Sequence, residues 1–399
     1  MEPKVRFKGF EGEWKTPSIG DVFELRNGYT PSKIVKEFWE GGTIPWFRME
    51  DIRMNGGFLK DSLQHITPLA VKGAGLFEKR SIILATTATI GVHAMLIADS
   101  LANQRFTNFK VRKSLSDEYI DEFIYYSFFK IDEWSINNTN SGGLLSVNMP
   151  LLVKQGFLTP CKEEQQAIAT YFLTLDSKIQ STSKKLASLK KLKSASLVAM
   201  FPQNGESMPK VRFKGFEGEW STNNLGSIFA ERIESNENGE MLSVTMNNGI
   251  IRSSDNGRFD NSNSDKSKYK VVKIGDIAYN SMRMWQGASG VSQYEGIVSP
   301  AYTVVTPSVD VDTDFFGYLF KTDDVIRLFK LNSQGLTSDN WNLKYPAFSR
   351  ICVSYPKSKE EQQAIAAYFR SLDRKIALET ARLEKLKQIK LACLDKMFV

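Results

Sequence analysis

Two segments of the sequence occur twice, and this duplication limits the possible folds more than any other feature. Residues 162–179 (KEEQQAIATYFLTLDSKI) and 359–376 (KEEQQAIAAYFRSLDRKI) are identical at 14 of 18 positions. Residues 3–14 (PKVRFKGFEGEW) recur without change as residues 209–220. The two offsets are 197 and 206 residues, so the material between the repeats differs in length. We therefore expect two copies of one unit, with constant connecting segments and variable inserts.

Each copy of the first repeat opens a helical pattern of about 40 residues, or roughly 60 Å at 1.5 Å per residue. Glu163 and Glu164 fall in the first turn, where carboxylates favour the positive end of the helix dipole. The apolar positions step by three and four residues, as in a coiled-coil seam. The seam comprises Leu175, Ile179, Leu186 and Leu189 in the first helix, and Leu372, Ile376, Leu383 and Leu386 in the second. We expect the helices to pair with each other; the alternative is that each packs only on its own domain.

Both inserts have the pattern of a mixed α/β domain. Apolar or alternating runs predict strands at residues 81–89, 106–111, 156–159, 274–279 and 301–306. Helical spacing predicts helices at residues 117–134 and 313–330, the first with Asp117 as its N-cap. Pro45 indicates an edge or loop position for residues 43–47. The expected division is 1–16 (arm), 17–160 (first domain), 161–202 (helix), 203–220 (linker and arm), 221–357 (second domain) and 358–399 (helix).

Composition is that of an ordinary globular protein with a basic balance. Of 399 residues 42% are hydrophobic and 24% charged, and the formal net charge is +7, which permits an anionic partner. Three scattered cysteines fit a reducing cytoplasm, and the N-terminus has no signal-peptide pattern. Residues 81–98 are uncharged, but their Thr, Gly and His residues favour two buried strands joined near Gly91 over a membrane span. We expect a cytoplasmic protein.

Motifs for catalysis are missing from the sequence. There is no GxxxxGK[ST] phosphate loop, no strand-associated GxGxxG and no Asn/Asp-Pro-Pro-aromatic tetrapeptide of amino-methyltransferases. The two histidines, His65 and His93, have no metal-ligand partner at helical spacing. Carboxylate pairs such as Asp323-Asp324 are explained by helix N-termini. We expect a chain with no catalytic residue of its own, no metal site and no bound cofactor.

Basic residues interleaved with aromatics and amides occur in both inserts, for example in WFRMEDIR (46–53) and NSMRMWQ (280–286). Guanidinium and amide groups read guanine and adenine edges, and lysines neutralise phosphates. On this chemistry we expect DNA contacts from Arg48, Arg53, Gln104, Arg105 and Asn148 in the first insert, and from Arg258, Lys268, Asn280, Arg283, Gln286 and Asn340 in the second.

The duplicated helix opening EEQQAIA..YF..LD.KI, together with GYTPS…FWEGGTIPWF and GDIAYNSMRMWQGA…GIVSPAYTVV, resembles the specificity subunit of type I restriction–modification systems. The resemblance covers essentially the whole chain. It implies an α/β (α+β) fold with two similar target recognition domains, separated by two long helices in an antiparallel coiled coil with a pseudo-two-fold internal repeat. Each domain would read one half of a bipartite, asymmetric DNA target.

The resemblance also implies partners. The paired helices would carry two methyltransferase subunits that hold S-adenosylmethionine and methylate adenine. Separate motor–nuclease restriction subunits, which use ATP and Mg, would cleave unmodified DNA. The seam interruptions at Lys193, Ser196, Glu379 and Lys390 are then expected to face the methyltransferase subunits.

Two readings from other classes remain open at this point. A stand-alone DNA-binding regulator would act without enzyme partners, and neighbouring methyltransferase and motor genes or co-purification would exclude it. A coiled-coil adaptor without DNA would show no DNA binding, or binding that does not depend on salt.

Overall fold

The computed structural model describes residues 2–140, 143–203, 205–246, 248–256, 265–337 and 340–398. Arg258, one of the predicted DNA contacts, lies outside these residues. The chain divides into two compact units, Met1–Ser183 with Ala381–Val399 and Lys184–Thr380. Each unit therefore contains one insert and a part of both long helices.

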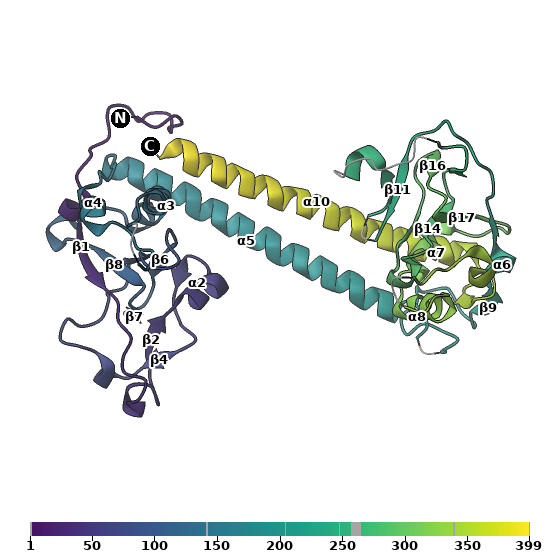
Figure 1. Ribbon diagram of the computed structural model, residues 1–399, viewed down its shortest axis with the longest axis horizontal. Helices are drawn as coiled ribbons and strands as arrows, with labels where there is room; N and C mark the ends of the chain where they lie inside the picture. The colour runs from purple at the N-terminus through teal and green to yellow at the C-terminus, as the bar shows by residue number, and fades with distance from the viewer. Residues whose placement is uncertain are drawn as a thin grey trace. The chain divides into compact units, whose positions relative to one another are not determined.

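The first unit is built on a five-stranded sheet of order β1-β8-β5-β6-β3 with a smaller sheet of order β4-β2-β7 (Figure 1). Its strands are β1 (Phe23–Asn27), β2 (Ile44–Phe47), β3 (Phe58–Leu59), β4 (His65–Ile66), β5 (Ile82–Ala85), β6 (His93–Leu96), β7 (Leu101–Ala102) and β8 (Phe106–Val111). Its helices are α1 (Ile19–Val22), α2 (Met49–Asn55), α3 (Asp121–Asn137), α4 (Met149–Lys154), the first part of α5 (Lys162–Ala199) and the last part of α10 (Lys359–Met397).

Residues 81–98, which are uncharged, form the two strands β5 and β6, and the burial of β5 explains their apolar composition. All four residues of β5 are buried, and alternate side chains enter two different cores. Ile82 and Leu84 pack with α3 and α5, whereas Ile83 and Ala85 pack with the smaller sheet. Gly91, with φ of 77°, lies between β5 and β6 as expected. Among the described residues no helix is long and apolar enough to cross a membrane.

The second unit repeats the central sheet with the order β10-β17-β14-β15. Its strands are β9 (Ser221–Asn224), β10 (Phe229–Glu231), β11 (Leu242–Thr245), β12 (Gly249–Arg252), β13 (Lys270–Val272), β14 (Ile277–Asn280), β15 (Ser289–Val291), β16 (Gly296–Val298), β17 (Tyr302–Pro307) and β18 (Cys352–Tyr355). Its helices are the last part of α5, α6 (Leu225–Ile228), α7 (Thr313–Leu319), α8 (Asp323–Asn332), α9 (Tyr345–Phe348) and the first part of α10 (Lys359–Met397). The strands β1, β8, β5 and β6 thus correspond to β10, β17, β14 and β15.

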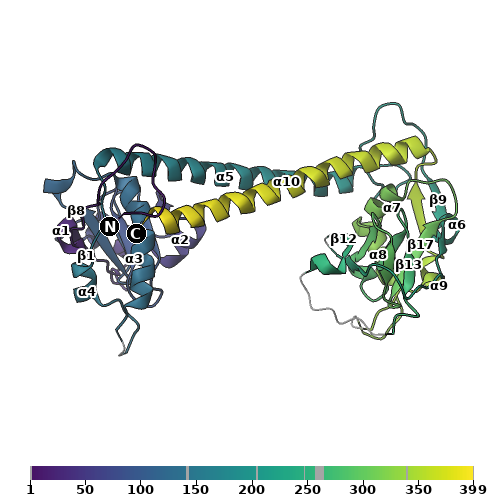
Figure 2. The ribbon, with the colours of Figure 1, turned by 90° about the horizontal axis from the view of Figure 1, so that it is seen from above.

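Helices α5 and α10 lie side by side and antiparallel within each unit (Figures 1 and 2). In the first unit Asp176 of α5 pairs with Lys390 of α10 at 2.6 Å. In the second unit Lys193 of α5 pairs with Asp373 of α10 at 2.5 Å. Both ion pairs include a tyrosine hydroxyl that donates to the same carboxylate, from Tyr126 or Tyr318. Of the seam positions, Leu175, Leu186, Leu372 and Leu383 are buried, and Ile179, Leu189, Ile376 and Leu386 are partly buried.

The positions that interrupt the seam make polar contacts between the two helices, and their expected contact with methyltransferase subunits stays a prediction. Lys193 and Lys390 pair across the two helices, and Glu379, itself buried, accepts from Lys185 at 2.5 Å. Ser196 lies 2.9 Å from the hydroxyl of Tyr368. These polar side chains hold α5 and α10 together, because opposite charges and hydroxyls meet across the pair.

The repeated arms fasten the helix ends to each unit. Arg6 forms two hydrogen bonds of 2.7 Å to the Glu164 carboxylate, and Arg212 forms the equivalent bonds of 2.6 and 2.7 Å to Glu361. Both glutamates are buried at the start of the long helices. In both arms the arginine thus satisfies a buried carboxylate with nearly the same geometry.

An aromatic residue closes each core from the end of the other long helix. Phe398 lies 5.8 Å from Phe172 and 6.5 Å from Trp14, between ring centroids. Phe201 packs in the same way on Phe369 and Trp220 in the second unit. The C-terminal end of α10 therefore does in the first unit what the C-terminal end of α5 does in the second.

Some local expectations differ from the structure. Helix α3 begins at Asp121 and not at residue 117, because Ile120 is the N-cap and its N–H is bound by Gln165. The helix expected at residues 313–330 is broken into α7 and α8. Strand β2 is central in its sheet despite Pro45, because the N–H groups of Thr43 and Trp46 supply the bonds to the neighbouring segment. Residues 156–159 form isolated bridges to residues 15 and 18 and no full strand.

Candidate nucleic-acid interface

Loops from distant parts of the sequence meet at one end of the central sheet in the first unit. Strand β5 ends at Ala85 opposite Phe106, where β8 begins, and Thr86 donates its N–H to the carbonyl of Arg105 at 2.9 Å. The N–H of Ala88 donates to Leu145 at 2.9 Å. We call residues 28–30, 48, 86–90, 103–105 and 143–147 the first edge.

Gly28 is needed where the first edge is most tightly packed. A Cβ at this position would lie 2.3 Å from the carbonyl oxygen of Asn103 and 2.4 Å from that of Ala102. The close approach lets Tyr29 donate its N–H to Ala102 at 2.9 Å. Ala88 has φ of 67°, a left-handed conformation rare for alanine, held by the bond to Leu145. The backbone of the first edge is thus closely constrained.

Three of the predicted contacts lie together on the first edge. Gln104 and Arg105 are exposed, and Thr30 donates to the amide oxygen of Gln104 at 2.5 Å, which orients that side chain. The carbonyl of Phe47, next to Arg48, accepts the N–H of Asn103 at 3.0 Å. Arg48 is half-buried, with its guanidinium 5.9 Å from the Trp46 ring.

The other two predicted residues of the first insert are placed differently. Arg53 is exposed on α2, outside the first edge. Asn148 is the N-cap of α4 and accepts the N–H of Leu151 at 3.2 Å. Its side-chain oxygen therefore stabilises a helix end, which the sequence pattern did not indicate because Asn serves both caps and base contacts.

The second unit has an equivalent set of loops at the same end of its sheet. Strand β14 ends at Asn280 opposite Tyr302, and Leu343 donates its N–H to the carbonyl of Ser281 at 2.8 Å. The rings of Trp285 and Trp341 pack edge to face at 5.1 Å. We call residues 280–287, 334–337 and 340–342 the second edge.

The second edge brings together four of the predicted residues. Arg283 and Asn340 are exposed, and Gln286 is half-buried. The side-chain oxygen of Asn280 accepts the N–H of Met282 at 3.0 Å, so it shapes the turn that carries Arg283. Lys268 is exposed in the turn before β13, outside the second edge.

A hydroxyl pair at the base of each edge supports the equivalence of the two units. Thr86 and Thr107 are 2.9 Å apart in the first unit, and Ser281 and Thr303 are 2.8 Å apart in the second. All four are buried. The loops differ in sequence, but they leave the sheet from matching anchor points.

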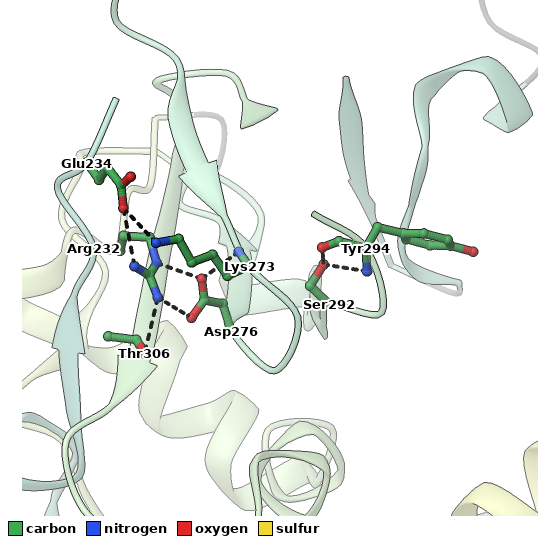
Figure 3. Close-up of polar contacts among 7 residues, drawn as sticks. All are labelled: Arg232, Glu234, Lys273, Asp276, Ser292, Tyr294 and Thr306. Carbon is green, nitrogen blue, oxygen red and sulfur yellow. Dashed lines mark hydrogen bonds and ion pairs between the residues drawn. The ribbon is translucent and has the colours of Figure 1, made fainter. Parts of the chain in front are cut away.

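Some arginines of the second unit form ion pairs within the protein, whereas others are exposed and could bind DNA. The Arg232 guanidinium donates to Asp276 at 2.7 and 2.9 Å and also approaches Thr306 and Glu234, as Figure 3 shows. Its hydrogen bond to Asp276 raises the pKa of Arg232 further above its ordinary value. Among the described residues Arg283 has no ion pair, and in the first unit the same holds for Arg105. Exposed guanidinium groups without a protein partner are the ones that can bind bases or phosphates.

Sequence reasoning missed several residues that shape the edges. These are Gly28, Thr30 and Ala88 in the first unit, and Trp341 and Lys321 in the second. Their roles depend on contacts between segments far apart in the sequence, which no local motif reports. In the described part of the chain no group of three or more His, Cys, Asp or Glu residues could hold a metal ion.

Comparison with known proteins gives one family for both inserts. The model of the type I restriction modification DNA specificity domain matches residues 11–191 and again residues 218–388. The specificity subunit of the type I restriction enzyme EcoprrI of Escherichia coli is 46% identical over 158 residues, which are 40% of this chain and 39% of that protein. The MjaIX specificity subunit of Methanocaldococcus jannaschii is 27% identical over 251 residues, 60% of this chain and 56% of that protein. The chain thus aligns with about half or less of each relative's length.

Solved structures support the fold. The S subunit of a type I restriction–modification system from M. genitalium has a TM-score of 0.63 at 16% identity, with 100% of this chain and 99% of that one covered. A chain from a study of complex assembly and conformational transition in the type I system has a TM-score of 0.54 at 14% identity, covering 97% of this chain and 98% of that one. Both likenesses concern the fold alone, because the identities are below 25%.

Proposed function

Because the chain belongs to the family of type I restriction–modification DNA specificity domains, we propose that it is the subunit that selects the DNA sequence in such a complex. Each unit reads one half of a bipartite, asymmetric target in duplex DNA. The first edge serves one half and the second edge the other. The two halves differ because the loops differ on equivalent scaffolds.

The observation that carries this proposal is an exposed arginine beside an amide residue at the same end of both sheets. The loop before β8 carries it in the first unit, and the loop between β14 and β15 carries it in the second. Arg105 with Gln104 and Arg283 with Gln286 occupy the ends of matching sheets. Arginine binds guanine O6 and N7 with two parallel hydrogen bonds, and glutamine does the same for adenine N6 and N7. A fixed backbone beneath these side chains makes such bonds selective, since discrimination depends on geometry.

The partners are proposed to perform the chemistry. Two methyltransferase subunits would dock on the α5–α10 pair, hold S-adenosylmethionine and methylate adenine. Motor–nuclease subunits would supply ATP-driven, Mg-dependent cleavage of unmodified DNA. This chain would bind none of these cofactors and would contribute no catalytic residue.

The long helices would then fix where methylation occurs. Flipping a base out of the duplex costs a few kcal/mol and requires the enzyme at a defined position. Two weak half-site contacts joined by a stiff connector act at a high effective concentration, so that together they bind tightly. The ion pairs that join α5 to α10 within each unit support the idea of a stiff connector.

Maps of methylated adenine in cells provide the test. Three strains are compared: one with this chain, one without it, and one in which residues 17–160 are replaced by those of another family member. We expect a bipartite motif that disappears without the chain and changes in only one half after the exchange.

Two outcomes would contradict the proposal. A motif that persists without the chain would show that another subunit selects the site. A motif that changes in both halves after the exchange would show that the units do not read separately. Co-purification of the tagged chain with methyltransferase subunits, expected here, separates this function from that of a stand-alone regulator.

A further inference from the structure

Lys321 occupies an unusual position behind the second edge. It follows α7, and its ammonium donates to three backbone carbonyls: those of Met246, Gly287 and Ser289. The distances to Met246 and Ser289 are 3.3 and 2.9 Å. A lysine ammonium has three N–H donors, so each donor has one acceptor.

The three carbonyls belong to two separate segments of the second unit. Met246 lies in the turn between β11 and β12, whereas Gly287 and Ser289 end the loop that joins β14 to β15. That loop carries Arg283 and Gln286 of the second edge. One side chain therefore ties the recognition loop to the neighbouring hairpin.

The recognition loop depends on such a tie because of its own conformation. Gly287 adopts a left-handed conformation, with φ of 80° and ψ of 20°, at the C-cap of a 3-10 turn over Met284–Gln286. Gly287 is buried, and a Cβ at this position would lie 3.2 Å from Ile326. A buried carbonyl without a donor costs about 1–3 kcal/mol. Lys321 satisfies this carbonyl.

The first unit uses a different residue at the corresponding place. His93 begins β6 as Ser289 begins β15, and its ring nitrogens lie 2.6 Å from Asp132 and 2.9 Å from the Tyr125 carbonyl. Each unit thus has a basic side chain that joins the end of its edge loop to a neighbouring layer. Among the described residues, a lysine has this role in the second unit and a histidine has it in the first.

We propose that Lys321 is a positioning residue for the second half-site, which holds the loop of residues 280–289 in the conformation that presents Arg283 and Gln286 to DNA. This inference rests on the proposed DNA-reading function of the second edge. Lys321 acts through the loop backbone and does not itself contact bases.

The electrostatic surroundings make this role dependent on pH. Burial, with repulsion from Lys193 of α5, lowers the pKa of Lys321 to about 8. Lys193 is itself paired with Asp373 of α10 and lies 5.6 Å from the Tyr318 ring of α7. The hairpin and the loop present backbone carbonyls to the ammonium. Above pH 8 the neutral amine keeps two donors, and its lone pair faces an acceptor, so the tie weakens.

The first experiment measures loop order without DNA. Hydrogen–deuterium exchange of the full chain is compared for wild type, Lys321→Met and the control Lys273→Met. Lys273 is a half-exposed lysine of the same unit that pairs with Glu234 at 3.3 Å, away from the loop. We expect faster exchange at residues 281–289 in Lys321→Met only. Unchanged exchange there would overturn the inference.

The second experiment measures half-site discrimination by the chain with its co-purified subunits. Duplexes carry the mapped target or a single substituted base in one half. We expect Lys321→Met to reduce discrimination at the second half-site about fivefold or more, the scale of one lost base-edge contact, without changing the first. Lys321→Arg, which stays charged, should restore discrimination and remove its pH dependence.

The wild-type pH profile supports or refutes the inference even where a variant fails to fold. Discrimination at the second half-site should fall between pH 7 and 9, while that at the first stays constant. Equal changes at both half-sites, or none, would overturn the inference. If Arg283→Ala alters the second half-site and Lys321→Met does not, the inference fails and the proposed function stands. If Arg283→Ala has no effect on either half-site, the second edge itself is misassigned.

Discussion

The buried ion pair between Arg6 and Glu164 gives the sharpest test of how the repeated arms stabilise each unit. The Glu164 side chain is 1% exposed and that of Arg6 16%, and the two hydrogen bonds of 2.7 Å run in parallel. Arg6 also donates to the carbonyls of Gly12 and Glu11 at 2.6 and 3.1 Å. Arg6→Ala would leave a buried carboxylate without a partner, which costs about 3–5 kcal/mol.

That cost is large compared with the stability of a domain, about 5–15 kcal/mol. For a unit of this size we expect the unfolding temperature to fall by roughly 6–20 °C, at about 2–4 °C for each kcal/mol. Calorimetry measures the change, and hydrogen–deuterium exchange assigns it to the first unit. Arg212→Ala is the matched variant and should affect the second unit by a similar amount.

A loss below about 1 kcal/mol, the value for exposed ion pairs, would refute this reasoning. The double variant Arg6→Met with Glu164→Met separates charge burial from packing, because apolar replacement of both partners removes the unpaired charge. We expect it to be more stable than Arg6→Ala. If it is equally unstable, the arm is held by other contacts.

Further predictions address the edges, the aromatic closures, Lys321 and the helix pair. Gly28→Ala should cost about 1–3 kcal/mol and weaken reading of one half-site, since its Cβ would lie 2.3 Å from the Asn103 carbonyl oxygen; denaturant unfolding and duplex binding check this. Phe398→Ala should destabilise the first unit, and Phe201→Ala the second, by about 3–5 kcal/mol each, as hydrogen exchange would localise. The pKa of Lys321 is about 8 in the folded state, against an ordinary value of 10.5. Burying the charged ammonium therefore costs folding free energy below pH 8, and this cost is relieved as pH rises to 10.5. In urea unfolding, the free energy of unfolding of wild type relative to that of Lys321→Met should therefore rise by up to about 3 kcal/mol across that window. One helical turn inserted in both α5 and α10 should lengthen the DNA spacer by about one to two base pairs without altering either half; an unchanged spacer in the methylation map would contradict this.

Much of the architecture follows from local sequence rules. Two long helices are predicted because apolar positions spaced three and four residues apart continue beyond each copy of the duplicated helix opening. Strand β8 coincides with the predicted residues 106–111, whose Phe, Thr and Val residues favour strands. The expected helix pairing is present within each unit.

The polar interior of the helix pair could not be read from the pattern. Lys193 and Lys390 look like exposed interruptions in an apolar seam, yet each binds a carboxylate 180 or more residues away in sequence. A seam can include charges when the opposite helix supplies the counter-charge. Only the three-dimensional pairing shows that Asp373 and Asp176 are those partners.

Residue chemistry suggested which side chains could contact DNA, but it could not show how the chain brings them together. The structure places Gln104 and Arg105 on the first edge, and Asn280, Arg283, Gln286 and Asn340 on the second, and their contact with DNA stays a prediction. Residue chemistry did not distinguish Asn148, which caps α4, from an amide free to bind a base. It also gave no sign of Lys321, whose three acceptors come from two distant segments.

The central claim is that two equivalent edges read two different halves of one DNA target. It is tested most directly by binding of the assembled complex to duplexes with one substituted base, for wild type, Arg105→Ala and Arg283→Ala. We predict that each variant loses about 1–3 kcal/mol of discrimination in one half only, and that the two variants affect opposite halves. Arg105→Lys and Arg283→Lys, which keep the charge, should retain affinity but not discrimination. Loss of affinity that is equal for all duplexes, or loss of discrimination in both halves from one variant, would contradict the claim.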